Sequence, residues 1–313
     1  MAQDFTTTGL LASVKRRGML PTTSSGQALD VVDYLAFGTE ELQTYVLDLL
    51  LSANQEYAVT DSDIAIVAST DTYAVPQRAS DEALRQVLLN DGLGTLNVNY
   101  YPITQVSPAN SYDSVSGSPA RGYYYKDGSI VLVPSPTASS TLRLQYFRRP
   151  SALVATSAVA TISSINLART VITTTATVPA TFTSGITTDI VSHVPGFRIQ
   201  SMDQVTSGTV SGTTITYTNA LPASVVAGNY VALAGESPVP QVMVEAHPLL
   251  AQRIVVKALE ALGDKKVDAA SAVCDRMRKE LLARLMPRTK GTVQYVVNPN
   301  GPGLRGRLGR RRF

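Results

Sequence analysis

An α+β fold is expected for this chain of 313 residues, and three observations predict it. Apolar residues recur at helical spacing towards both ends, β-branched and aromatic runs separated by turn residues fill the middle, and a basic segment without either period closes the chain. We therefore expect a discontinuous helical bundle, formed by N-terminal helices and a C-terminal αα-hairpin. Antiparallel β-domains are inserted between these halves, and an extended C-terminal tail follows.

Helices are predicted for the first part of the chain. After Thr8, an apolar-periodic run ends in three basic residues and a glycine, which is common at helix C-termini. A second short helix is expected over about 27–36. A third is expected to begin with Thr39 as N-cap, because two glutamates occupy the next positions and an apolar stripe at helical spacing continues over 42–53.

The following region is predicted to be mostly strands. Residues 71–76 are expected to be extended, whereas 80–89 is predicted to be a helix with Leu84, Val87 and Leu88 on its inner face. Asp127-Gly128 stands between two β-rich runs, which predicts a hairpin with a type I′ turn. The alternating run over 141–147 predicts a third strand.

Residues 155–235 differ sharply in composition from the rest of the chain. Only four of these 81 residues are charged, and Thr, Ser and Val supply 36 of them. We expect short antiparallel strands in a sandwich or small barrel rather than a low-complexity linker, because each segment carries large apolar residues to bury. Such an uncharged sheet has weakly protected edges, which implies neighbours that cover them.

Two helices are predicted near the C-terminus. Apolar residues fall every four positions over 250–262, Gly263 ends that helix, and Asp264 can cap the next. The second apolar stripe includes Cys274, which we expect to be a small buried residue, and Pro287 ends it.

The expected domain boundaries follow from these patterns. They are 1–92 for the N-terminal helical part, 93–154 for a β-hairpin and antiparallel sheet, 155–235 for the inserted β-domain, 236–287 for the helical hairpin that completes the helical core, and 288–313 for the extended basic tail.

The net charge of +3 conceals an asymmetry. Residues 287–313 hold seven basic and no acidic residues, so 20 basic and 24 acidic residues remain and the rest of the chain carries a charge of −4. A short basic tail on a mildly acidic body predicts a negatively charged partner, either nucleic acid or an acidic protein groove.

The residue types that catalysis needs are scarce. The chain has one cysteine and two histidines, His193 and His247, and lacks a phosphate-binding glycine loop, a signal-peptide pattern and an apolar run long enough to span a membrane. Neighbouring acids fall at predicted caps or turns; they are Asp61 and Asp63, Asp81 and Glu82, and Glu40 and Glu41. We therefore expect no enzyme activity, no cofactor, no metal site and no membrane association.

The tyrosine run 123–125 has two interpretations. It could stack on the bases of single-stranded nucleic acid. In a strand, however, Tyr123 and Tyr125 share one face, which favours packing within the sheet or a subunit contact.

Several segments together resemble a known family. They are MLP at 19–21, EELQ at 40–43, YAVPQRA at 73–79 leading into LRQV at 84–87, YYYKDGSIVLVPSP at 123–136, TLRLQYFRRPSALV at 141–154, GNYVALAGESPVPQV at 228–242 and HPLLAQRIVVKALEALGD at 247–264. The chain resembles the head–tail adaptor (connector) proteins of tailed bacteriophages, of the podovirus-type head-completion group, over about 10–298. The Thr-rich block after residue 155 is the part least like the family.

The resemblance implies a structural protein of the virion neck, assembled in the host cytoplasm. Twelve copies would form a ring beneath the portal protein, contact other neck or tail proteins, and line the channel through which double-stranded genomic DNA leaves. The C-terminal tail would reach the portal. The candidate partner-binding residues there are Val293, Tyr295 and Val297, which alternate and suit addition to a sheet edge, and Arg305, Arg307, Arg310, Arg311 and Arg312, which suit acidic groups or DNA phosphates.

Three other function classes stay open at this point. The chain could be another β-rich phage tail component, such as a tail-tube or receptor-binding protein, or a DNA-binding protein that acts through its basic tail. The third is an enzyme, for example a glycan hydrolase with paired carboxylates. For the adaptor, we expect ring closure to be templated by the portal, each tail becoming ordered as it docks.

Overall fold

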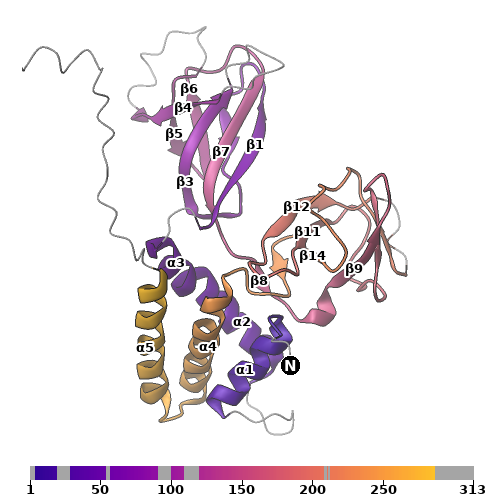
Figure 1. Ribbon diagram of the computed structural model, residues 1–313. Coiled ribbons are helices and arrows are strands. Elements are labelled where there is room, and N and C mark those ends of the chain that lie inside the picture. Colours follow the sequence, from indigo (N-terminus) through magenta and orange to yellow (C-terminus); the bar gives the residue numbers. More distant parts are fainter. Residues whose placement is uncertain are drawn as a thin grey trace, which may run out of the picture.

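The computed structural model describes residues 4–19, 29–53, 57–90, 100–108, 120–207, 210 and 212–285. Figure 1 shows three parts: a helical bundle that contains the N-terminus, a first sheet above it, and a second sheet beside both. Helices from both ends of the sequence enclose two β parts from its middle, which confirms the predicted α+β class. The predicted tail at 288–313 lies outside the described residues.

The N-terminal helices are α1 (Thr7–Gly18), α2 (Val31–Glu41) and α3 (Leu47–Ala53), with a π-helical turn at Leu42–Val46 joining the last two. The prediction of two separate helices with a start at Thr39 is wrong. The actual cap is Asp30, whose carboxylate accepts hydrogen bonds from two first-turn amides while the Asp33 carboxylate accepts one from the Asp30 amide. Thr39 lies inside α2, and its hydroxyl donates to the Leu35 carbonyl at 2.9 Å.

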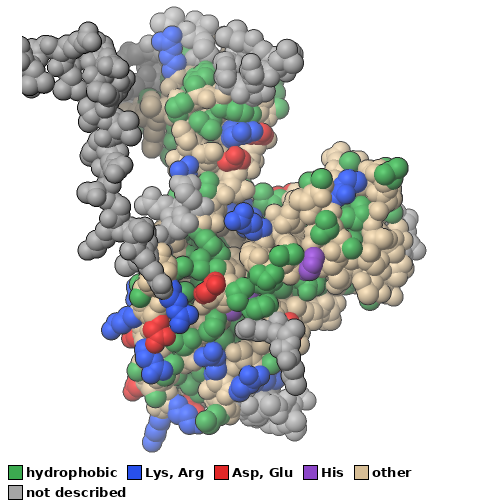
Figure 2. All heavy atoms as spheres, in the orientation of Figure 1, with side chains coloured by type: hydrophobic (Ala, Val, Ile, Leu, Met, Phe, Trp, Pro, Cys, Tyr) green, Lys and Arg blue, Asp and Glu red, His purple; other side chains and the backbone are tan. Residues whose placement is uncertain are grey.

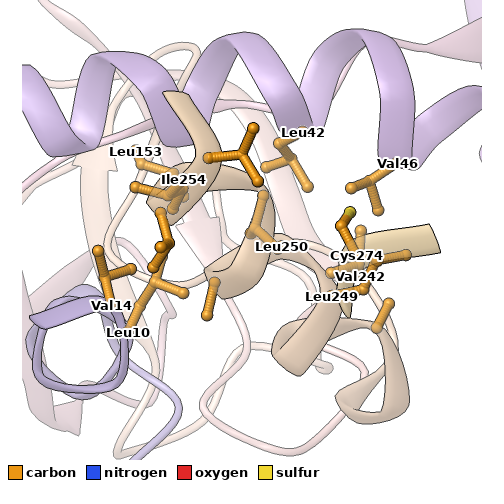
Figure 3. Packing of buried hydrophobic residues seen from close by; sticks show 14 of the residues in the cluster. Leu10, Val14, Leu42, Val46, Leu153, Val242, Leu249, Leu250, Ile254 and Cys274 are labelled. Atoms are coloured by element: carbon orange, nitrogen blue, oxygen red, sulfur yellow. The ribbon is translucent and has the colours of Figure 1, made fainter. Parts of the chain in front are cut away.

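The C-terminal helices confirm the predicted hairpin. They are α4 (His247–Leu262) and α5 (Val267–Leu285), and Gly263 ends α4 with a φ of +65° that suits glycine. Figure 3 shows that side chains from α1, the π-helical turn, α4 and α5 point into one shared core. Cys274 is buried in this core, as predicted. The N-terminal and C-terminal helices therefore form one hydrophobic core.

The first sheet has seven strands in the order β1-β7-β3-β4-β5-β6-β2. Their bounds are β1 Val59–Ile66, β2 Thr72–Ala74, β3 Ala79–Asn90, β4 Tyr100–Gln105, β5 Gly122–Lys126, β6 Ser129–Val133 and β7 Ser140–Arg148. All pairs are antiparallel except β4 with β5. Every strand contributes to a single apolar cluster, so the sheet folds over on itself. The predicted hairpin is confirmed, with φ values of +47° at Asp127 and +68° at Gly128.

The helix predicted over 80–89 is wrong, because these residues form strand β3. Its backbone is hydrogen-bonded to β7 on one side and to β4 on the other, and this pairing overrides the helical spacing of its apolar residues. Val87 and Leu89 alternate into the core. The pairing register of β3 with β7 shifts twice, between Ala79 and Leu84 and between Leu84 and Gln86. Asp81, within the first shift, has a φ of +52°.

The second sheet has six strands in the order β12-β11-β14-β9-β10-β13. Their bounds are β9 Ala160–Ile165, β10 Val171–Thr174, β11 Thr187–Val191, β12 Ile199–Val205, β13 Thr214–Thr216 and β14 Tyr230–Leu233. A bridge between Thr206 and Tyr217, with hydrogen bonds from Ser207 to Thr216 and from Thr218 to Val205, joins the two end strands. The sheet therefore closes into a small barrel around an apolar interior. The two end strands are joined to each other, so this sheet does not need neighbouring proteins to cover its edges, contrary to the expectation.

Both β parts leave the bundle and return to it at adjacent points. At the base of the first sheet, the Arg148 amide donates to the Ala58 carbonyl at 2.8 Å. At the base of the barrel, β8 (Ala152–Leu153) pairs in parallel with β15 (Glu236–Ser237). Short 3-10 turns at Thr156–Ala158 and Val244–Ala246 continue the chain beyond them. The helical core can therefore close although its halves are far apart in sequence.

A buried ion pair links the two halves of the bundle. Glu41 at the end of α2 accepts two hydrogen bonds from the Arg253 guanidinium on α4, at 2.6 and 3.0 Å. The Glu41 side chain is 3% exposed, and the Arg253 guanidinium also lies 4.2 Å from the centre of the Tyr45 ring. Removing one partner of a buried pair leaves a charge without compensation, which costs more than the pair contributes.

Replacing Arg253 by methionine should lower the free energy of unfolding by about 3 kcal/mol, because Glu41 would stay buried without a hydrogen-bonded partner and with only the Lys257 ammonium 3.8 Å away. Urea denaturation followed by circular dichroism measures this. The matched control is Arg143→Met: Arg143 also makes a two-bond pair, with Asp63, and lies over the Tyr100 ring, but that pair is exposed. The control should lose about 1 kcal/mol or less. Equal losses in both variants would contradict the assigned role of Glu41.

His247 should make the stability of the fold sensitive to pH. It is buried at the start of α4 against the rings of Phe5 and Phe197, and its Nε2 lies 3.3 Å from the Val242 carbonyl. Burial lowers the pKa of His247 below its usual value. The unfolded chain therefore takes up a proton first as the pH falls, and the folded state loses stability below about pH 6.5.

The variant His247→Gln should remove this pH sensitivity. Its unfolding free energy, compared with that of the parent chain across the same pH range by urea denaturation, should show a smaller decline towards low pH. The loss of ring packing lowers its stability at every pH, so the slope and not the absolute value is the readout. A slope that matches the parent chain would rule out His247 as the responsible group.

Candidate functional site

The acid pairs named in the sequence lie on regular elements, and this corrects their expected placement at caps or turns. Asp61 and Asp63 lie on β1 with exposed side chains, and two hydrogen bonds from Arg143 lower the pKa of Asp63. Glu40 and Glu41 lie within α2 and pair with Lys257 and Arg253 of α4. Asp63, Glu40 and Glu41 therefore act as structural partners of basic residues.

The histidines and the cysteine occupy separate packing positions. His193 on the barrel places Nδ1 3.0 Å from the Asn229 side-chain oxygen, whereas His247 belongs to the start of α4. Burial raises the pKa of the Cys274 thiol, which disfavours the reactive thiolate. Within the described ranges, no three His, Cys, Asp or Glu residues come together as metal ligands would.

Within the tyrosine run, Tyr123 packs inside the first sheet, which is the interpretation that the alternation favoured, whereas Tyr125 is 37% exposed. The rings of Tyr123 and Tyr125 meet edge to face at 5.8 Å between centres. Tyr123 is buried, and that burial raises its pKa to about 12. A ring held in this way presents little free face to a nucleic-acid base.

The tail residues predicted to bind a partner lie outside the described residues. This applies to Val293, Tyr295, Val297, Arg305, Arg307, Arg310, Arg311 and Arg312. Their assignment stays a prediction.

An apolar groove on the bundle is the clearest candidate site in the described part of the chain. It measures about 680 Å³ and lies between α2 and the segment that runs through β8. Val31 and Val32 at the start of α2 are 42% and 69% exposed beside it. Leu153 of β8 anchors the opposite wall in the helical core, as Figure 3 shows. The sequence contained one signal for this site, two valines directly after the Asp30 cap, where a polar first turn is more usual.

Gly38 brings the two walls of this groove together. A Cβ atom at this position would stand 3.0 Å from the terminal carbons of both Ile254 and Leu153. The lack of a side chain therefore lets α2 approach α4 and β8 closely. The groove is a fixed feature of the packed bundle.

An ionic cluster holds the barrel against the first sheet. The Arg78 guanidinium pairs with the fully buried Asp189 of β11 and, at 3.0 Å, with Asp203 of β12. Asp189 also accepts hydrogen bonds at 3.0 Å from the amides of Asp203 and Gly235. All acceptor oxygens of Asp189 are thus used, and the cluster fixes the placement of the two β parts.

The surface of the bundle carries charges of both signs. Figure 2 shows Lys and Arg side chains interspersed with Asp and Glu over the helices, and few charges on the barrel. Among the helices that the structure describes, none has the length and hydropathy to cross a membrane.

Comparison with known proteins identifies the family. The family model of the SU10 adaptor protein matches residues 5–172, which is more than half of the chain and runs from α1 through the first sheet into β10 of the barrel. No curated protein matches the chain. The match confirms the phage head–tail adaptor resemblance drawn from the sequence, while the podovirus type stays a prediction. The chain therefore belongs to the SU10 adaptor protein family, and its role is that of a structural head–tail adaptor of a phage virion.

Proposed function

We propose that the chain is one subunit of a ring beneath the portal protein, in a neck of podovirus type. Twelve copies surround the channel through which genomic DNA leaves, and the tail at 288–313 docks on the portal. The observation that carries the ring is the groove along α2, because it is an open apolar surface on elements within the family match. Next to it, Thr39, Glu40 and Thr44 supply a polar rim.

The groove favours a second copy of the chain as its occupant. Exposed apolar area costs about 25 cal/mol per Å² until it is covered. In a ring, the same face of one neighbouring copy would cover the groove of every subunit. A heterologous contact of this kind needs a groove on one face and a projecting element on another. Figure 1 shows two β parts that project away from the bundle and can serve as that element.

Charge supports the division between body and tail. The body without the tail carries −4, which suits a channel wall along which DNA must slide, since numerous phosphate contacts would hold it. The basic tail suits acidic groups on the portal, where arginine can pair with carboxylates through two hydrogen bonds. Binding of DNA by the tail is the alternative.

Replacing Val32 by aspartate should prevent ring formation, because a charge would be buried at the subunit contact. Native mass spectrometry of the chain mixed with the portal from the same phage measures assembly. We expect the parent chain to convert from monomer to portal-bound ring, and the variant to assemble at least about tenfold more weakly.

The matched control for this experiment is Leu262→Asp. Leu262 is 40% exposed at the end of α4 on the bundle, and it does not line the groove. It should assemble like the parent chain, and both variants should keep their circular dichroism spectra. A Val32→Asp chain that forms the ring normally would remove the groove from the interface. A stable trimer that ignores the portal would instead support a tail-tube or receptor-binding protein.

Ending the chain at Asn298 should abolish attachment to the portal while leaving the fold intact, because five arginines are then missing. A full-length variant with those arginines changed to glutamine shows whether the loss of attachment comes from the missing charge or from the shorter tail. Co-sedimentation with the portal measures attachment. Unchanged attachment in both variants would show that the tail has another role. Duplex binding with a salt dependence that falls on truncation would identify DNA as its target.

A further inference from the structure

A small cavity lies where the three parts of the molecule meet. It measures about 240 Å³, and each part supplies some of its wall. Leu47 comes from α3. Tyr57, just before β1, and Arg148, the last residue of β7, come from the base of the first sheet. Arg198 comes from the barrel, and Gln241 from the segment before α4. Figure 2 shows basic side chains at the surface in this region.

Three hydrogen-bond donors in this wall have no acceptor among the described residues. The Arg148 guanidinium is half-buried, and neither a carboxylate nor another acceptor pairs with it there. Arg198 at the rim has no ion pair in the same ranges. Gln241 is 7% exposed, and its Oε1 accepts a hydrogen bond from the Ser151 amide at 3.3 Å while its buried Nε2 donates to nothing described. A buried donor without an acceptor costs free energy, so the Nε2 of Gln241 and the half-buried Arg148 guanidinium need an explanation, whereas Arg198 at the rim is exposed to solvent.

The wall of the cavity contains two cations, Arg148 and Arg198, and no carboxylate. Asp189 and Asp203 nearby are both paired with Arg78, and Glu245 near Tyr57 does not line the cavity. Asp189 attracts Arg148, but no described carboxylate forms an ion pair with Arg148 or Arg198. Burial lowers the pKa of Arg148 and outweighs the attraction of Asp189 and the neighbouring tyrosines.

We propose that this cavity binds one oxyanion, a carboxylate or a phosphate, held by Arg148, Arg198 and the Nε2 of Gln241. Guanidinium groups bind such anions through paired hydrogen bonds, and an amide N–H completes the set. The volume suits a single carboxylate or phosphate and is too small for a nucleic-acid backbone with its sugars. Because the donors come from the sheet, the barrel and the segment before α4, a bound anion links all three parts.

The occupant has two sources with the same chemistry. It is either a free anion from solution or the carboxylate of an acidic side chain from a neighbouring protein. The isolated full-length chain distinguishes them if inorganic phosphate and N-acetylglutamate amide are compared as probes. Tighter binding of phosphate indicates the free anion, and tighter binding of the glutamate derivative indicates a side chain.

Isothermal titration calorimetry at constant ionic strength, with chloride as the balancing salt, tests the site. We expect saturable binding of one anion per chain, weakened about tenfold or more by Arg198→Met and by Gln241→Leu. Arg198 is exposed, so its replacement leaves the fold intact even if Arg148→Met does not fold. The matched control is Arg149→Met, since Arg149 is an exposed arginine next to Arg148 that does not line the cavity.

Binding that Arg149→Met leaves unchanged and Arg198→Met weakens supports the proposal. Absence of saturable binding for both probes, or equal weakening by Arg149→Met and Arg198→Met, overturns it. The titration uses the isolated chain, so its result is independent of ring formation and of the portal.

Discussion

Burial of α4 is the constraint on which the rest of the structure depends. This helix packs against α1, α2 and α5 at once, and its Arg253 reaches Glu41 across 212 positions of the sequence. Closing so long a loop is entropically costly unless the intervening chain folds into units whose ends already lie together. The first sheet meets this condition where Arg148 bonds to Ala58, and the barrel meets it where β8 pairs with β15. Each β part thus delivers the chain back to the bundle, and the Arg78 cluster then fixes the two parts against each other.

Much of the fold could be predicted from local patterns, because many of its elements are locally consistent. The helices α1, α4 and α5, the hairpin at Asp127-Gly128 and the strand β7 all carry their own period and end signals. Strand β3 could not be predicted, since its sequence has helical spacing and only pairing with β4 and β7 makes it extended. The start of α2 was also missed: Thr39 followed by two glutamates has the composition of a cap, but Asp30 and Asp33 already form one. Barrel closure depends on the Thr206–Tyr217 bridge, which joins β12 and β13, the strands at the two ends of the sheet order.

The candidate sites differ in how well they could be predicted from the sequence. The basic tail is visible as composition, whereas the groove along α2 was signalled only by two valines after a cap. The cavity had no sequence signal at all, because Tyr57, Arg148, Arg198 and Gln241 come from four separate segments and each is unremarkable alone. Glu41 illustrates the same limit in the core. The sequence placed it in the first turn of a helix, whereas it ends α2 and pairs with Arg253 in the other half of the bundle.

The direction of the β8–β15 pair limits how the chain can be shortened. Two antiparallel strands can be joined by a turn of two residues, but parallel strands need a crossover of a dozen residues or more. Because β8 and β15 run in parallel, the whole barrel serves topologically as their crossover connection. A deletion that replaced the barrel by a tight turn would prevent β8 from pairing with β15, whereas a single helix of suitable length could replace the barrel as the connection. The smallest adaptor that keeps this bundle therefore still contains a compact insertion at this point.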